Sequence, residues 1–489
     1  MAEHDRNWSA DLQVEKVDDF TWRIPRRGPM RVDGIVFADD RLMEAIRSDK
    51  SLEQVANVAC LPGIVKASVA MPDIHWGYGF PIGGVAGFDP GEGVFSPGGV
   101  GYDINCGVRL LSTHIDVAEV REKIADFVPR LFSNIPTGVG SHRKDLKLSR
   151  KDAERVSRQG ARWAVELGMG SAEDLEMIEE GGTIPGADFG GVSEKAYGRG
   201  RDQLGTLGSG NHFVEVGYVD ELYDERLAGR IGLRRNGLTV IIHTGSRGFG
   251  HQICEDYLRT MQQAAVRHGI YLPDRQLCCA PVGSDEGERY LAAMACAANF
   301  AFANRQLITH WVRETVEEAW GLTPRQHGVR VVYDVCHNIA KRERHRIDGV
   351  EREVMVHRKG ATRAFPAGHP QVPEPYRDVG QPVLVPGDMG RYSFVLVGHP
   401  DSPDYTFSSC CHGAGRRMSR TQATKVARSR NIIKELLDRG IHVAAASRET
   451  VVEEFPDAYK DVAEVVDVVH GAKLAIKVAR LRPIGVIKG

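Results

Sequence analysis

The stretch "SPGGVGYDINCGVRLL" places a carboxylate, Asp103, and a thiol, Cys106, three residues apart among several glycines. Glycine at this density costs backbone entropy and supplies no core, so it favours a chain that bends sharply or approaches a ligand closely. Carboxylates and thiolates are both common metal ligands. The stretch is therefore typical of a site, although Asp103 alone would suit a turn and Cys106 alone would suit a small buried side chain.

Three histidines stand where an apolar or glycine-rich segment ends. In "GTLGSGNHFVEVGYV" a glycine-rich loop leads to His212, and the buried strands predicted in "LTVIIHTGSRG" and "VRVVYDVCHN" end at His243 and His337. Residues at strand ends meet at the loop edge of an α/β sheet. Most of the 18 histidines are expected on the surface or hydrogen-bonded in the core. The setting of these three favours a functional role instead.

One carboxylate, one thiolate and three imidazoles make a set that suits two metal ions: Asp103, Cys106, His212, His243 and His337. A thiolate can bridge two ions while the other ligands complete each one. Carboxylate and imidazole ligands with open positions accommodate Mn²⁺, whereas a set of thiolates alone would indicate zinc or an iron–sulfur cluster. The mixture also leaves zinc open.

A fourth histidine, His412, lies in "SSCCHGAGRRMSR". Gly413 and Gly415 remove side chains from the space around it, and the following arginines add positive charge. Glycine and arginine in this combination suit a phosphate group.

Periodicity predicts the elements that must position these residues. Apolar positions at helical spacing predict helices in "DVAEVREKIADFVPRLF", "ERYLAAMACAANFAFANRQLITHWVRETVEEAW" and "SRNIIKELLDRG". Short apolar runs predict strands in "LTVII", "VRVVYDV" and "YSFVLVG", and segments rich in glycine and proline, such as "PAGHPQVPEPYRDVGQPVLVPGD", predict loops. The fold class is mixed α/β (α+β). We expect residues 71–489 to form one interdependent catalytic domain, with residues 1–70 as an amino-terminal segment packed on it.

Composition excludes several classes. Lys plus Arg (63) and Asp plus Glu (65) nearly cancel, so no global basic field indicates a nucleic-acid partner, and any such partner needs a local patch. Nine scattered cysteines without a CxxC pair favour reduced thiols over a disulfide framework. The polar opening and the absence of a long apolar run predict a cytosolic protein without a membrane segment.

Ten ordered motifs together resemble those of the RtcB family of RNA ligases, also called tRNA-splicing ligases. They run from about Met71 to Gly489 and are "MPDIHWGYGFPIGG", "GGVGYDINCGVRLL", "LGTLGSGNHFVEV", "HTGSRG", "CHN", "RKGATRA", "VPGDMG", "CHGAGRRMSR", "AYKDV" and "RPIGVIKG". Ten motifs in order are far more specific than a single short pattern.

The resemblance implies a GTP- and Mn²⁺-dependent enzyme with the family's own α/β fold. Such an enzyme joins RNA ending in a 2′,3′-cyclic phosphate or a 3′-phosphate to RNA beginning with a 5′-hydroxyl, in tRNA splicing or RNA repair. It implies RNA and GTP as partners, an archease-type protein as a candidate activator, and a monomer.

The resemblance also implies roles for individual residues. Cys106 would bridge two Mn²⁺ ions, with His243 and His337 on one and Asp103 and His212 on the other. His412 would be the nucleophile that accepts GMP. The guanylate pocket would be formed by Asn211, His212, Phe213, Val214, Glu215, His337, Asn338, Pro386, Gly387, Asp388, Met389, Ser393, His412, Gly413, Ala414, Gly415 and Lys488.

Several of these roles have a physical basis. A carboxylate at Glu215 can accept hydrogen bonds from the N1–H and N2–H edge of guanine but meets an acceptor at N1 of adenine, so it would favour GTP over ATP. Lys488 requires the carboxyl-terminal segment to fold into the site. Asp388 departs from the serine of several family members, and we expect its backbone to make any nucleotide contact. Arg247 and Arg416 are candidates for phosphate contacts, with solvated surface arginines as the alternative.

Two other functions use the same residues. The first is a dinuclear phosphodiesterase or cyclic-phosphate hydrolase that transfers no nucleotide. The second is a non-catalytic RNA-binding scaffold, which the near-neutral charge disfavours because sequence-independent RNA affinity rests on phosphate neutralisation.

Overall fold

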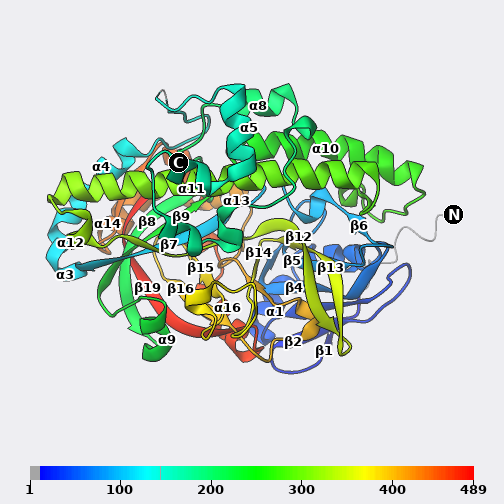
Figure 1. Ribbon diagram of the computed structural model, residues 1–489. Coiled ribbons are helices and arrows are strands. Elements are labelled where there is room, and N and C mark those ends of the chain that lie inside the picture. Colours follow the sequence, from blue (N-terminus) through cyan, green and yellow to red (C-terminus); the bar gives the residue numbers. More distant parts are fainter. Residues whose placement is uncertain (1–11, 144) are drawn as a thin grey trace.

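Two β-sheets and a long helix that crosses them form the framework of the molecule (Figure 1). This computed structural model describes residues 12–143 and 145–489. Helices and sheets alternate along the chain, which confirms the predicted mixed α/β class. None of the helices within the described ranges has the length and apolar character needed to span a lipid bilayer.

The first sheet has seven strands and includes the strands that the structure describes before residue 71. Its order is β1 (Glu15–Lys16), β2 (Thr21–Ile24), β3 (Asp33–Phe37), β4 (Ile64–His75), β5 (Ile82–Phe88), β13 (Val350–Lys359) and β12 (Asn338–Ile347). Only β3 and β4 pair in parallel. Residue 70, the predicted end of the amino-terminal segment, lies inside β4. The division at this residue stays a prediction, and residues 1–11 of that segment lie outside the described residues.

The second sheet has eight strands and carries most of the predicted ligands at its ends. Its order is β11 (Arg330–Cys336), β7 (Gly107–Asp116), β9 (Gly237–Thr244), β8 (Phe213–Leu222), β19 (Ala475–Lys488), β16 (Ser393–Gly398) and β15 (Pro382–Val385). Neighbours along this path are antiparallel, and β18 (His442–Ala445) adds to β19 in parallel.

The long helix α11 (Asp285–Trp320) crosses the molecule above the sheets (Figure 1). Ser284 caps its amino end by accepting from the Gly287 N–H, and Gly321 ends it in a left-handed conformation with φ 64°. Its 36 residues span about 54 Å at 1.5 Å per residue. Alanines and other small residues fill its middle, so the helix packs closely against the core of the second sheet. This element confirms the helix predicted there.

The remaining elements connect these layers. Two small antiparallel pairs join β6 (Val94–Phe95) to β10 (Ala280–Pro281) and β14 (Ala361–Arg363) to β17 (Ser409–Cys411). The other α-helices are α1 (Asp40–Ile46), α2 (Ser51–Val58), α3 (Val117–Val120), α4 (Ile124–Asn134), α5 (Arg150–Gln159), α6 (Ala161–Glu166), α7 (Ala172–Glu176), α8 (Glu194–Gly200), α9 (Glu225–Arg230), α10 (Arg247–Arg267), α12 (Pro324–His327), α13 (Arg420–Ala427), α14 (Ile432–Leu437), α15 (Arg448–Glu453) and α16 (Val462–Gly471).

The strands predicted at 238–242, 329–335 and 392–398 are confirmed as parts of β9, β11 and β16. Two regions differ from the sequence expectation. The helix expected over 116–132 is divided into α3, a 3₁₀ turn over Arg121–Lys123, and α4. The proline-rich segment 366–388 contains strand β15, because Pro382 lies at the first position of a strand at the sheet edge, where a missing N–H is tolerated.

Candidate active site

Five neighbouring strands of the second sheet bring their ends to one edge. Strands β11, β9 and β19 end there, and the antiparallel strands between them, β7 and β8, begin there. The register pairs Gly107 with Thr244, Phe213 with His243, and Lys488 with Phe213. Residues far apart in the sequence therefore lie side by side because alternate strands run in opposite directions.

The first group of possible metal ligands joins Cys106, His243 and His337, all buried. The Cys106 Sγ lies 3.3 Å from the His243 Nε2, and the Nε2 atoms of His243 and His337 lie 3.4 Å apart. Three potential donor atoms thus face one another from three strand ends.

The second group joins Asp103, Cys106 and His212, so Cys106 belongs to both groups. The His212 Nε2 lies 2.8 Å from the Asp103 Oδ2 and 3.4 Å from the Cys106 Sγ. The His212 Nδ1 lies 3.0 Å from the Leu207 carbonyl oxygen, which fixes the proton on Nδ1 and leaves the Nε2 lone pair for a ligand. A Cβ at Gly245 would meet the Asp103 carboxylate at 2.4 Å, so this approach requires glycine there.

The donor set fits a pair of divalent ions. Burial lowers the pKa of His243 and His337 well below the ordinary value, which keeps both imidazoles neutral and able to donate a lone pair. Burial, followed by the nearby Asp103, raises the pKa of the Cys106 thiol, so binding of a cation would release its proton. The ligand types suit manganese or zinc.

His412 follows strand β17 and is held by a residue that the sequence did not single out. The Asp73 carboxylate, near the end of β4, lies 2.6 Å from the His412 Nδ1 and accepts from its backbone N–H at 3.1 Å. Asp73 is fully buried. A carboxylate on Nδ1 keeps the proton there and leaves the Nε2 lone pair free. The His412 ring centroid lies 4.7 Å from that of His337, so His412 adjoins the first ligand group.

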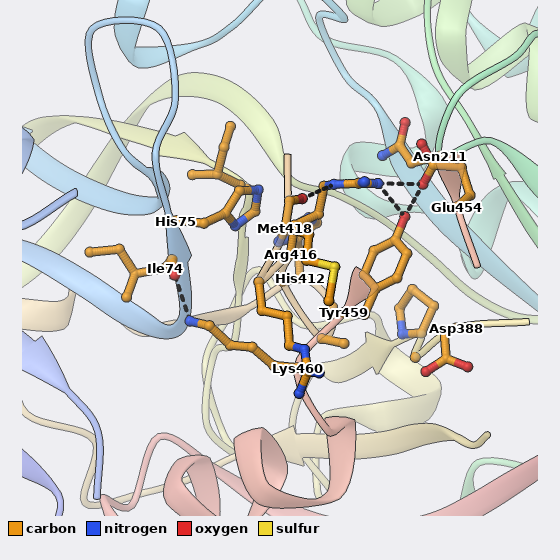
Figure 2. Close-up of a pocket in the computed structure, with 18 of the residues that line it drawn as sticks. Ile74, His75, Asn211, Asp388, His412, Arg416, Met418, Glu454, Tyr459 and Lys460 are labelled. Carbon is orange, nitrogen blue, oxygen red and sulfur yellow. Dashed lines mark hydrogen bonds and ion pairs between the residues drawn. The ribbon is translucent and has the colours of Figure 1, made fainter. Parts of the chain in front are cut away.

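A cavity of about 890 Å³ opens around His412. Figure 2 shows His412 between two sets of lining residues, with Ile74, His75 and Lys460 on one side and Asn211, Glu454 and Asp388 on the other. Most of the predicted guanylate pocket lines this cavity: Asn211, Phe213, Glu215, His337, Asn338, Pro386, Gly387, Asp388, Met389, His412, Gly413, Ala414, Gly415 and Lys488.

Three residues of the predicted pocket lie outside the lining. His212 faces the second ligand group, and Val214 points into the core because alternate residues of β8 face opposite sides. Ser393 lies behind Glu215 and donates to its Oε1 at 3.3 Å. Ser393 therefore supports the cavity wall without forming its surface.

Glu215 and Lys488 are buried ionisable groups that face the cavity. Burial raises the pKa of the Glu215 carboxyl to about 8 and lowers the pKa of the Lys488 amine to about 8. The Lys488 Nζ lies 5.6 Å from the centroid of the Phe213 ring. Ionisable groups whose pKa lies near neutrality and that face one cavity are typical of functional sites.

Asp388 lines the cavity, but its side chain is occupied elsewhere. Its Oδ1 accepts from the Gly390 N–H at 2.9 Å, and its Oδ2 accepts from the Arg391 Nε at 2.5 Å. The side chain is therefore engaged within the protein, and the nucleotide contact through its backbone stays a prediction.

The two arginines considered for phosphate contacts already have partners. Arg416 donates to the Glu454 carboxylate at 2.9 Å and to the Glu453 carbonyl oxygen at 2.9 Å. Arg247 donates to Thr206 and Ser141, at 3.1 Å each, and joins two loops beside the second ligand group. Both guanidinium groups therefore hold the walls of the site.

Trp76 and Lys460 line the cavity and were not predicted. Trp76 is 57% exposed. Lys460 donates to the carbonyl oxygens of Pro72 and Ile74, at 3.1 and 2.5 Å. Trp76 lies in the motif "MPDIHWGYGFPIGG" and Lys460 in the motif "AYKDV", so the motifs, and not the residue types, could have indicated them.

Comparison with known proteins gives a consistent result. The sequence profile of one family, described as "tRNA-splicing ligase RtcB", matches residues 54–489. A tRNA-splicing ligase RtcB of Thermococcus kodakarensis is 55% identical over 98% of this chain and 99% of its own length. An RNA-splicing ligase RtcB of Mycobacterium tuberculosis is 52% identical over 89% of this chain and 100% of its own length. The profile match begins before residue 71, closer to the amino terminus than the motifs alone indicated.

If Cys106 is a ligand in both groups, Cys106→Ala should weaken both ion sites, whereas His243→Ala should weaken only one. Equilibrium dialysis with Mn²⁺ followed by elemental analysis should give about two ions per chain for the unchanged protein, about one for His243→Ala and fewer than one for Cys106→Ala. Cys60→Ala, which removes a buried thiol outside both groups, is the control. Full occupancy in Cys106→Ala would contradict the shared role.

Proposed function

Because the chain belongs to the RtcB family, we propose that it is an RNA ligase of tRNA splicing that uses GTP and Mn²⁺. It joins an RNA 2′,3′-cyclic phosphate or 3′-phosphate end to a 5′-hydroxyl end. The ligase assignment rests on the family, whereas the dependence on GTP and Mn²⁺ is what the family resemblance implies, with support from the residues of the site.

One observation carries the proposal of nucleotide transfer. His412 lines a cavity of about 890 Å³ with its Nδ1 held by Asp73, and its Nε2 has no hydrogen-bond partner among the described residues. A neutral imidazole with a free Nε2 is a competent nucleophile. Hydrolysis by metal-bound water would not require such a residue, so the hydrolase alternative is not favoured.

The proposed reaction has three steps. The His412 Nε2 attacks the α-phosphorus of GTP, the bond to the β-phosphate oxygen breaks, and pyrophosphate leaves. An oxygen of the RNA 3′-phosphate then attacks the GMP phosphorus and the bond to Nε2 breaks, which gives an RNA-ppG end. Finally the 5′-hydroxyl of the second RNA loses its proton and attacks the RNA 3′-phosphorus, and GMP leaves. A cyclic phosphate must first be opened by water.

Asp73 supports the first and second steps. When Nε2 bonds to phosphorus while Nδ1 keeps its proton, the imidazole ring becomes positively charged. The buried Asp73 carboxylate, 2.6 Å from Nδ1, stabilises that charge and holds the ring in one orientation.

Asp103, Cys106, His212, His243 and His337 are the residues that would hold two divalent ions beside His412. Such ions would offset the negative charge that develops on phosphate oxygens as the leaving group departs.

Glu215 is the proposed determinant of guanine recognition. Its carboxylate faces the cavity and its Oε1 is oriented by Ser393 at 3.3 Å. An ionised carboxylate accepts from both N1–H and N2–H of guanine, whereas adenine presents an acceptor at N1. With adenine bound, the buried Glu215 carboxylate would therefore lack the hydrogen-bond donor that N1–H of guanine supplies.

The side of the cavity where Figure 2 shows His75 and Lys460 is the proposed place of the RNA ends. Trp76 directly follows His75 in the chain, and Lys50 and Arg417 also line the cavity. The Trp76 backbone N–H donates to Asp49 at 2.8 Å, which fixes the residue while its side chain stays 57% exposed. An exposed indole beside cationic side chains suits a stacked base and its phosphates.

A cytosolic location, a monomeric state and an archease-type activator stay predictions of the sequence and its family resemblance. The RNA-binding scaffold stays an alternative outcome of the following test.

The proposal predicts a covalent adduct on His412. Incubation with α-labelled GTP and Mn²⁺ should give an acid-labile labelled protein, and His412→Ala should give none, because the nucleophilic atom is absent. His399→Ala, which removes a histidine of a surface loop, is the control. Opening of a cyclic phosphate without any adduct would indicate the hydrolase, and RNA binding without either reaction would indicate the scaffold.

A second prediction concerns pH. Burial raises the Glu215 pKa to about 8 in the free protein, so the ionised form that guanine needs becomes populated as the pH rises toward 8. GTP affinity of the unchanged protein, measured by calorimetry, should increase between about pH 6.5 and 8.5 relative to Glu215→Gln. The comparison with Glu215→Gln removes the opposing effect of Lys488, whose pKa is also about 8.

Glu215→Gln should also weaken GTP binding at the upper end of this range by about 10–100-fold. The loss follows from the roughly 1.5–3 kcal/mol of a hydrogen bond to a charged group. Glu225→Gln, at an exposed position on α9, is the control. Parallel pH curves for Glu215→Gln and the unchanged protein would argue against recognition by this carboxylate.

A third prediction separates RNA from nucleotide. Trp76→Ala should raise the KM for 3′-phosphate RNA by about 5–100-fold, since stacking of one base on an aromatic ring contributes roughly 1–3 kcal/mol. The yield of the GTP adduct should not change. Tyr223→Ala removes an exposed aromatic ring away from the cavity and should leave both quantities unchanged. An unchanged RNA KM in Trp76→Ala would remove Trp76 from the RNA site.

A further inference from the structure

Arg305, in the middle of α11, is a fully buried arginine that binds three separate chain segments. Its Nη1 donates to the carbonyl oxygens of Asn105 and Thr244, both at 2.9 Å. Its Nη2 donates to the Asn105 side-chain oxygen at 3.0 Å, and its Nε donates to the Asp334 carboxylate at 2.9 Å.

Each of these segments carries a member of the two ligand groups. Asn105 lies between Asp103 and Cys106, and it has a left-handed backbone with φ 53°. Thr244 directly follows His243. Asp334 lies on β11, three residues before His337. One guanidinium group therefore joins the loop and the two strands that present these ligands.

The preceding residue of α11, Asn304, binds the remaining segment. Its side-chain oxygen accepts from the N–H groups of Gly205 and Thr206 at 2.8 and 3.1 Å. Its Nδ2 donates to the carbonyl oxygens of Thr206 and Gly245 at 3.1 and 3.2 Å. These contacts join the loop that leads to His212 to the turn that follows His243.

We propose that Asn304 and Arg305 are positioning residues that set the spacing of the two proposed metal sites from one helix. The inference rests on the two metal ions of the proposed function. It explains why the segments that carry their proposed ligands lie so close together. Neither side chain belongs to the two ligand groups, and both are fully buried, so they act through the backbone of the ligand segments.

Arg109 is a suitable control for Arg305. If Arg305 only stabilised the fold, replacing either arginine should have similar effects. Arg109 is also fully buried and donates to the same Asp334 carboxylate at 2.8 Å. Its Nη1 also donates to the side-chain oxygens of Gln306 and Thr309 of α11, at 2.7 and 2.9 Å. Arg109 thus shares the Asp334 carboxylate and the contact with α11, whereas the bonds to Asn105 and Thr244, which neighbour Cys106 and His243, come from Arg305.

The arrangement depends on the fork of the guanidinium group. A lysine keeps the positive charge beside Asp334, but its single ammonium cannot reach Asn105, Thr244 and Asp334 in the same geometry. A Cβ at Gly107 would lie 3.0 Å from the Arg305 Cζ, so glycine at this position gives the guanidinium its space. Arg305→Lys should therefore loosen the ligand segments without leaving Asp334 as an unpaired buried charge.

The test compares Arg305→Lys with Arg109→Lys by titration with Co²⁺, which gives a charge-transfer absorption when a thiolate is a ligand. Thermal unfolding without metal measures how much each substitution lowers the stability of the fold. We expect Arg305→Lys to weaken Co²⁺ affinity by about 10–100-fold, the range typical for residues that orient metal ligands. Arg109→Lys should keep the Co²⁺ affinity of the unchanged protein, even if its unfolding temperature falls by as much as that of Arg305→Lys.

A second pair covers the case in which Arg305→Lys does not fold. Asn304→Ala should weaken Co²⁺ binding, whereas Thr309→Ala, at another buried polar position of α11, should not. Equal losses in the members of each pair, or an Arg305→Lys protein that binds Co²⁺ as tightly as the unchanged one, would overturn the positioning role. Absence of Co²⁺ binding by the unchanged protein would instead overturn the proposed metal pair itself, and this inference with it.

Discussion

Five possible donor groups from four chain segments must meet within a few ångströms in a buried place, and this requirement shapes the rest of the molecule. An antiparallel sheet meets it because one edge collects the ends of some strands and the beginnings of their neighbours. Cys106, directly before β7, therefore lies beside His243 near the end of β9. The sheet alone fixes the order of the ligands, and contacts from α11 fix how closely their loops approach.

Two classes of buried charge matter most for the site. Arg305 and Asp334 form ion pairs away from solvent, and such paired charges hold the framework in one arrangement. Glu215, Lys460 and Lys488 face the cavity, and burial moves the pKa of each to about 8. Groups of the second class gain or lose a proton with a small change in free energy near neutral pH. A bound ligand that carries a hydrogen-bond donor, an acceptor or an opposite charge can therefore determine their protonation state.

Much of this arrangement could be predicted from local patterns. Apolar runs that end in histidine indicated β9 and β11, and glycine clusters indicated the loops beside Asp103 and His412. Asp73 could not be predicted in this way, because it lies within a strand and its partner His412 is 339 residues away. Arg305 was equally hidden, since a polar residue in an apolar helix has no local sign of partners 200 and 61 residues distant. The contacts of Asp73 and Arg305 depend on how distant segments pack together, which residue type alone does not reveal.

Strand β19 lies between β8 and β16 in the middle of the second sheet, although its residues come late in the chain. During synthesis on the ribosome, β8 and β16 are made before β19. Until β19 pairs with them, the backbone groups on the edges that face it stay unpaired. The nascent sheet is therefore divided, and it is exposed to association with other chains until residues 475–488 emerge. Lys488 reaches the cavity only when β19 pairs, so the same event joins the two parts of the sheet and adds this residue to the cavity wall.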